Sequence, residues 1–327
     1  MKKLIIKIIG VLLLICFLIY LFYSPRLKFD VLENPNKDST KTTQNKDAQK
    51  TETNAENPKP EKGVSTWVGQ SLDVFKQKDK YYLITTKKGI VKSVYATGKD
   101  ANVNPIKIQD DASHVFEKYS INPEPMISVN GKQYQLELSD SDMKTQALIK
   151  FKDIYAQVYI DQQSNEVVAV RYLDSEALAA FKPYQMLSTK EDKEVKSKYS
   201  NITYEQNSNQ LTTLYEITNE MRKLKDAEPL KVNNQLTHIA SFNLYEAIGT
   251  DSVEFTEDAL KQQLNEQEVP FVSASQNVGY DFNEVPTLIH SWLNSDIHRS
   301  RMLNSKYNEM GGEVTNGYYT IIFVEDK

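Results

Sequence analysis

The segment SWLNSDIHRSRML, residues 291–303, decides how the last third of the chain is interpreted. It completes an apolar pattern at helical spacing, which predicts a helix over residues 283–299 with a buried face of Val285, Leu288, Ile289, Trp292 and Leu293. His290 points away from that face and is predicted to lie at the surface. His298 stands beside Arg299 at the end of the helix, where it could do chemistry, bind a metal or serve only the fold. Its neighbours decide between these roles.

Two further helices and a terminal hairpin are predicted around this segment. Apolar residues at steps of three and four predict one helix over residues 210–225 and another over residues 233–249, with Asn233 or Asn234 as the cap of the second. His238 lies off the apolar stripe of that helix and is expected to be solvated. Residues 311–326 predict a hairpin turning at Asn316 and Gly317. Helices that alternate with short strands predict an α/β/α sandwich for residues 205–327.

Residues 64–186 predict a separate α+β domain with duplicated helix-hairpin units. Apolar and polar residues alternate on both sides of Lys88-Gly89, and residues 156–174 repeat this pattern about 75 positions later. Similar short stretches, residues 69–77 and 109–118, are predicted to be helical, and Asn130-Gly131 predicts another hairpin. His114 is expected at the surface or in packing. The domain shows no catalytic constellation, and a charged linker, residues 187–204, follows it.

The N-terminal residues predict a membrane anchor. Leu4–Tyr23 is apolar and about long enough to cross a bilayer as a single helix, which predicts a signal anchor over residues 1–24. The lysines that precede it favour a cytoplasmic N-terminus and extracellular C-terminal domains. Residues 25–63 predict a disordered stalk; from Asp30 to Lys62 the sequence is polar and charged, with only Val31 and Leu32 available for burial.

Composition excludes several kinds of site. The net charge is −5 and no basic stripe is present, so nucleic acid is not an expected partner. The only cysteine is Cys16, inside the apolar segment, which excludes disulfides and thiolate metal sites from the rest of the chain.

The order of motifs in residues 205–327 resembles the CAP superfamily, which includes cysteine-rich secretory proteins and plant pathogenesis-related proteins. Its elements are Asn219-x-x-Arg222, the SQNVG segment and, most specifically, a Trp-x-x-Ser-x-x-His-Arg pattern at residues 292–299. Residues 64–186 resemble the CAP-associated N-terminal region of membrane-anchored proteins of Gram-positive bacteria. The resemblance implies a cell-envelope location, at the membrane with a single span.

The resemblance also implies a cleft with two histidines and two acids, which binds a divalent metal in some members. His298 matches the second histidine, but Gln276-Asn277 stands where the family has Glu-Asn, and an amide is neither a general base nor a good metal ligand. The first histidine, expected near Phe255, is absent. The second acid stays open between Glu257, Asp258 and Glu266.

These substitutions predict a depleted site without metal or cofactor. We expect His298 to be a retained hydrogen-bonding residue and a binding cleft to involve His298, Gln276, Asn277, Glu257 and Arg299. The predicted function is a non-enzymatic module that binds a protein, peptide, lipid or cell-wall ligand. One alternative is a metal-assisted peptidase or other hydrolase using His298 with a nearby carboxylate. Another is an envelope-assembly protein that binds through residues 64–186.

Overall fold

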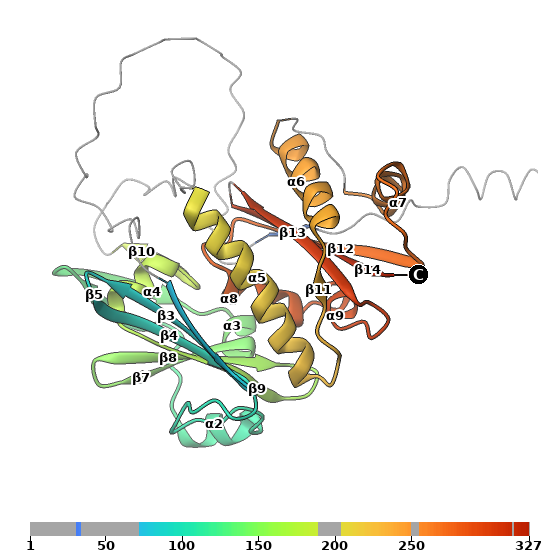
Figure 1. The fold of residues 1–327 in the computed structure, drawn as a ribbon. Helices are drawn as coiled ribbons and strands as arrows, with labels where there is room; N and C mark the ends of the chain where they lie inside the picture. The colour runs from blue at the N-terminus through green and yellow to red at the C-terminus, as the bar shows by residue number, and fades with distance from the viewer. Residues whose placement is uncertain (1–30, 34–71, 189–203, 250–254, 316, 327) are drawn as a thin grey trace, which may run out of the picture.

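A computed structural model describes residues 31–33, 72–188, 204–249, 255–315 and 317–326 (Figure 1). The predicted anchor Leu4–Tyr23, nearly all of the stalk and most of the predicted linker lie outside these residues. Within the described part, no helix has the length and apolar character needed to cross a membrane.

The N-terminal unit is built on a six-stranded sheet in which every neighbouring pair is antiparallel. The strand order is β2-β3-β4-β9-β8-β7, so two three-stranded meanders meet at β4 and β9. The predicted hairpin at Lys88-Gly89 is confirmed, with positive φ at both residues as a tight hairpin turn requires. The strands are β2 (Leu72–Gln77), β3 (Lys80–Lys87), β4 (Ile90–Thr97), β7 (Gln146–Phe151), β8 (Ile154–Asp161) and β9 (Glu166–Leu173).

Smaller elements cover this sheet. The Asn130-Gly131 turn joins two strands of a three-stranded sheet with the order β10-β6-β5. The expected helical stretch at residues 69–77 is wrong, because its described part is strand β2; a short apolar run fits either period, and pairing with β3 decides it. The predicted helix at residues 109–118 is present as α2. These elements are α2 (Ala112–Lys118), β5 (Met126–Val129), β6 (Lys132–Glu137), α3 (Asp140–Thr145), α4 (Ser175–Phe181) and β10 (Gln185–Ser188).

The C-terminal unit is a three-layer α/β/α sandwich, as its periodicity predicts (Figure 1). Its five-stranded sheet has the order β1-β12-β14-β13-β11. Helices α5, α8 and α9 cover one face, and α6 and α7 cover the other. The helices are α5 (Tyr204–Leu224), α6 (Asn234–Gly249), α7 (Glu257–Glu266), α8 (Val285–Leu293) and α9 (Asp296–Met302). The strands are β1 (Val31–Glu33), β11 (Lys231–Val232), β12 (Ser273–Tyr280), β13 (Glu309–Thr315) and β14 (Tyr318–Glu325).

The single helix predicted over residues 283–299 is instead two helices, α8 and α9. The Asn294 side chain donates to the carbonyl of Ile160 in the N-terminal unit at 2.9 Å and to that of His290 at 3.0 Å. Asparagine side chains that bond backbone groups compete with helix continuation, and Asn294 is the C-cap of α8. The break turns the chain so that α9 lies against β12.

The two units share one continuous apolar core. Tyr81 and Tyr95 of the N-terminal sheet belong to the same buried cluster as Leu214 of α5 and Ile289 of α8. Figure 1 shows α5 running along the boundary between the two units. The boundary is therefore a packed interior surface, which matters for several residues of the predicted site.

Candidate functional site

His298 lies inside the fold. Its side chain is on α9, and the residue is 2% exposed. The ring stacks parallel to Trp292 with centroids 6.2 Å apart, and Nδ1 lies 2.9 Å from Ser295 Oγ. Asn277 Nδ2 donates to the His298 carbonyl at 2.9 Å. Three positions of the Trp-x-x-Ser-x-x-His pattern therefore contact one another, and their interactions stabilise the α8–α9 turn.

Gln276 and Asn277 lie on opposite faces of the central sheet, because successive strand residues alternate. Gln276 is paired with Ile322, which packs with α6 and α7, whereas Asn277 is paired with Ile321, which packs with α5 and α8. Asn277 therefore shares the face of His298, and Gln276 does not. Among the described residues, Gln276 Oε1 and Asn277 Oδ1 are buried without a hydrogen-bond partner.

The acidic candidates lie on α7, on the same side of the sheet as Gln276. Glu257 is in the first turn of that helix and forms an ion pair with Lys261, one turn later. Asp258 and Glu266 are exposed. Phe255, where the family's first histidine is expected, is buried in the core below α6 and α7.

The donor set does not fit a divalent metal. The carboxylate candidates and Gln276 lie on one side of the sheet, and the enclosed His298 ring lies on the other. An amide replaces one acid, and a Zn²⁺ site needs converging imidazole, thiolate or carboxylate groups. In the described part of the chain, no group of three or more His, Cys, Asp or Glu side chains could hold a metal ion.

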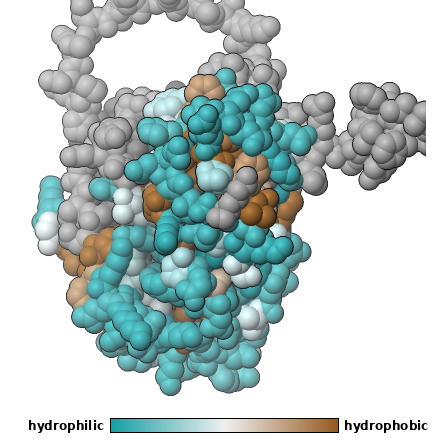
Figure 2. All heavy atoms as spheres, turned by 45° about the vertical axis from the view of Figure 1, so that its right-hand side comes forward, coloured by the Kyte–Doolittle hydropathy of each residue, from teal (hydrophilic) through white to brown (hydrophobic). Residues whose placement is uncertain are grey.

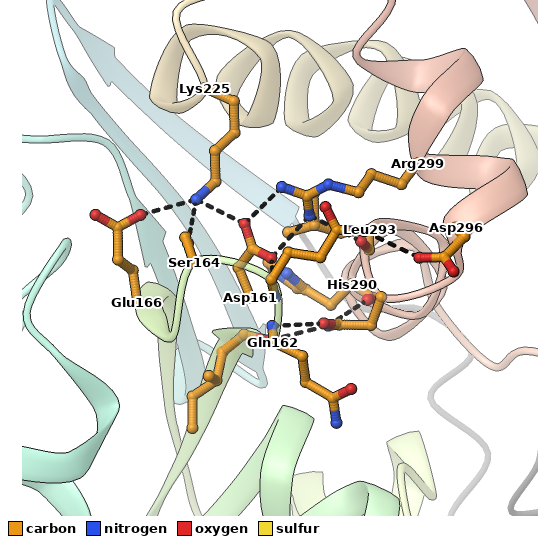
Figure 3. A network of polar contacts seen from close by, with 12 residues as sticks. Asp161, Gln162, Ser164, Glu166, Lys225, His290, Leu293, Asp296 and Arg299 are labelled. Atoms are coloured by element: carbon orange, nitrogen blue, oxygen red, sulfur yellow. Dashed lines mark hydrogen bonds and ion pairs between the residues drawn. The ribbon is translucent and has the colours of Figure 1, made fainter.

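Arg299 contacts the N-terminal unit, where it meets Asp161 at the end of β8 (Figure 3). Arg299 Nη1 and Nη2 lie 2.8 and 2.9 Å from the two carboxylate oxygens of Asp161, a bidentate pair. Lys225, just after α5, contacts Asp161 at 2.6 Å and Glu166 at 2.9 Å. Burial raises the pKa of Asp161, but hydrogen bonds from Arg299 and Lys225 outweigh it and hold that pKa below its ordinary value. Asp161 is fully buried and joins three segments of the chain.

A second ion pair crosses the same boundary. Arg171 of β9 is 1% exposed and donates from Nη2 to Glu284 Oε2 at 2.6 Å. Its guanidinium lies over the Phe181 ring at 4.9 Å and the Tyr159 ring at 5.6 Å. Glu284 is also the N-cap of α8 and accepts from Thr287 N at 3.1 Å. Burial lowers the pKa of Arg171, but the Glu284 carboxylate more than offsets it, so that pKa is raised.

The surface prediction for His290 is wrong: the residue is 3% exposed at this boundary. Its ring stacks on Tyr159 with centroids 4.0 Å apart, and Nε2 lies 2.9 Å from the Tyr95 hydroxyl. Burial, followed by the nearby Arg171 charge, lowers the pKa of His290 to about 3. The error has a physical cause, because the outer face of α8 is covered by the sheet of the N-terminal unit. His114 and His238 are exposed, in agreement with prediction.

The two residues of the Asn219-x-x-Arg222 motif bond backbone groups. Asn219 donates to the Leu230 carbonyl at 3.0 Å and accepts from its N–H at 2.8 Å. Arg222 is fully buried, and its guanidinium donates to four carbonyls, those of Glu228, Met302, Asn304 and Tyr307. Through Arg222, the motif therefore holds α5 against the end of α9 and the loop that follows it.

The comparisons with known proteins agree with this architecture. Residues 45–184 match the model of the CAP-associated N-terminal region, and residues 215–325 match that of the cysteine-rich secretory protein family. A crystal structure of a cysteine-rich secretory protein from Staphylococcus aureus subsp. aureus Mu50 is 52% identical, with a TM-score of 0.77, and covers 92% of this chain and 100% of that chain. The chain belongs to the cysteine-rich secretory protein (CAP) family.

Two more distant relatives fit the same assignment. An extracellular protein containing a SCP domain from Bacillus anthracis is 23% identical with a TM-score of 0.71, over 80% of this chain and 87% of that chain, and shows the fold alone. The "Uncharacterized membrane protein YlbC" of Bacillus subtilis is 26% identical over 265 residues, 76% of this chain and 72% of that protein.

Sequence analysis missed the residues that meet the CAP motif across the boundary. Asp161 and Arg171 lie in strands whose pattern is otherwise apolar, and nothing local distinguishes them from solvated positions. Glu284 carried a weak signal, since an acid two residues before Pro286 suits the start of a helix. Their partners are more than 100 residues away in the sequence.

Proposed function

We propose that this CAP-family chain is a membrane-tethered, non-enzymatic binding module at the cell envelope. The observation that carries the proposal is the separation of the family's site residues: the enclosed His298 ring and the amide of Gln276 belong to opposite faces of the central sheet. A hydrolytic site needs a base and an electrophilic group that converge on one substrate.

Exposed aromatic side chains support a binding role for the CAP domain. Phe242 and Tyr245 are 58% and 63% exposed, and their spacing of three residues places them on one outer face of α6. Figure 2 shows hydrophobic side chains at the surface in the upper half of the molecule, where Figure 1 places the C-terminal unit, among hydrophilic ones. Aromatic residues at a surface are typical of protein and ligand interfaces.

The metal-assisted alternative is tested by calorimetry with zinc on the full chain in detergent. We expect no heat of stoichiometric zinc binding from the native chain. The variant Gln276→Glu should also show no such heat, because the family's first histidine, expected near Phe255, is still absent. A one-to-one site of micromolar affinity in the native chain would overturn the proposal.

Binding is tested by co-sedimentation of the full chain with isolated cell envelopes of a strain that lacks it. For the double variant Phe242→Ser/Tyr245→Ser, the fraction bound to the envelopes should be at least tenfold smaller than for the native chain. The matched control is Ile90→Ser/Val91→Ser, which removes the exposed apolar pair at the start of β4 in the N-terminal unit. Loss in the control alone would favour the envelope-assembly alternative through residues 64–186.

Tethering needs a separate test. Protease added to intact cells should remove the region after Asp30 and leave the anchor in the membrane. Spontaneous release of a chain that begins near residue 25 would show instead that the anchor is a cleaved signal.

A further inference from the structure

A short strand from the predicted stalk completes the sheet of the CAP domain. Strand β1 pairs in parallel with β12, with Val31 opposite Val278, Leu32 opposite Gly279 and Glu33 opposite Tyr280. It forms the outer edge of the five-stranded sheet, so the backbone of β12 is paired on both sides over these residues. An unpaired edge accepts any extended segment, and here one segment of the same chain occupies it.

The contact is specific on the side-chain level. Leu32 is half-buried and packs against the core formed by α5 and α8. Its partner is a glycine, and a Cβ at Gly279 would lie 2.3 Å from Leu288 Cδ1 and 3.6 Å from the Leu32 carbonyl oxygen. The missing side chain lets Leu288 of α8 pack directly under the edge where Leu32 lies. The site therefore fits an extended segment with an aliphatic residue in its centre.

This pairing joins distant parts of the sequence. Val31–Glu33 precedes the whole N-terminal unit, whose first described residue is Leu72, yet it pairs with the C-terminal unit. From Asp30 to Lys62, Val31 and Leu32 are the aliphatic pair that the sequence makes available for burial.

The position of β1 limits how far the CAP domain lies from the anchor. Eight residue steps separate Tyr23, the end of the predicted anchor, from Val31, and they span at most about 29 Å. By contrast, 49 steps lead from Tyr23 to Leu72, the first described residue of the N-terminal unit, and span up to about 180 Å.

We infer that the β12 edge, Val278–Tyr280, is a binding site for the chain's own Val31–Glu33 segment, and that this contact holds the CAP domain beside the membrane. The membrane part of this inference rests on the proposed tether, whereas the strand contact does not. When β1 is bound, the edge of the CAP sheet stays within about 29 Å of the end of the predicted anchor. When β1 is released, the same domains reach several times farther from the membrane.

Cysteine cross-linking tests the contact, because Cys16 is the only native cysteine and Cys16→Ser gives a thiol-free chain. Glu33→Cys/Tyr280→Cys joins two positions in register, where neighbouring Cα atoms lie within disulfide range. The matched control, Glu33→Cys/Ser273→Cys, uses a similarly half-buried residue at the far end of the same strand. In full chain in detergent under mild oxidation, the first pair should cross-link at least tenfold faster than the control. Equal rates would overturn the inference.

Amide hydrogen exchange tests the contact without a substitution in β12 itself. Leu32→Asp should speed amide exchange at residues 278–280 at least tenfold and leave residues 318–325 of β14 unchanged. Unchanged exchange at both strands would also overturn the inference. If the anchor proves to be a cleaved signal, a released chain that begins near residue 25 still contains β1 and should still cross-link. Failure of tethering and failure of the strand contact are thus distinguishable.

Discussion

The stability of the protein should fall between neutral and mildly acidic pH because of the buried side chain of His290. Its folded-state pKa is about 3, against about 6.5 for an ordinary histidine. Because the folded pKa is lowered, the unfolded state binds the proton more readily between these values. The resulting loss of stability is absent above pH 6.5 and grows as the pH falls below it.

The magnitude follows from the two pKa values. Stability lost to one proton is about 1.4 kcal/mol per pH unit below the unfolded pKa, so between pH 7.5 and pH 5.0 this group costs about 2 kcal/mol. The low pKa is caused by burial and by the charge of Arg171, with Asp161 acting weakly in the opposite direction. The interval ends above the range where the lowered pKa of Asp161 would act.

The perturbation is His290→Gln, whose amide still reaches the Tyr95 hydroxyl but does not titrate. Urea unfolding of a chain that begins at residue 25 is measured at pH 7.5 and 5.0. The native protein should lose about 2 kcal/mol more than the variant over this interval. His238→Gln, at an exposed position, is the matched control and should behave like the native protein. Equal losses in native and His290→Gln protein would refute the assigned environment.

Three further substitutions test the boundary between the units, the Asn219-x-x-Arg222 motif and the packing of α6 on β13. Asp161→Asn should lower the free energy of unfolding by about 3 kcal/mol, as expected when one partner of a buried pair is removed; the half-exposed Glu166→Gln, which shares Lys225, should cost at most about 1 kcal/mol in the same urea titration. Arg222→Lys should cost about 3 kcal/mol by thermal melting, because one ammonium cannot serve four carbonyls held by a planar guanidinium. Gly311→Ala should cost about 2 kcal/mol and more than Gly279→Ala, because its Cβ would meet the backbone of α6 rather than a side-chain end.

Local signals in the sequence were sufficient for most of the fold. The turns at Lys88-Gly89 and Asn130-Gly131 need positive φ, and both form hairpins. The apolar faces of α5 and α6 follow helical spacing, because each packs on one side of the C-terminal sheet. Residues 69–77 and 283–299 were assigned wrongly where a longer-range contact, with β3 or with Ile160, overrides the local pattern.

The site was less predictable, because its environment comes from another part of the chain. The motif singles out His298 and Arg299, but it carries no information on Asp161, which binds Arg299 from 138 positions away. His290 was assigned to the surface since its own helix buries the opposite face. Strand alternation shows that Gln276 and Asn277 lie on opposite faces of β12, but only the contact of Asn277 with the His298 carbonyl shows which of them shares the face of His298.

The two buried ion pairs have a consequence for how the units sit together. A buried pair contributes little net stability, since desolvation of both charges offsets their attraction, but an arrangement that leaves either charge unpaired is strongly disfavoured. The Arg171–Glu284 and Asp161–Arg299 pairs contact opposite ends of the α8–α9 segment. Apolar contacts are not directional, so the core alone would tolerate several ways of packing α8 on the sheet. Only one of these arrangements brings both charge pairs together at the same time. We therefore expect the pairs to fix the orientation of the CAP domain, while stacking and aliphatic burial supply most of the free energy that holds the units together.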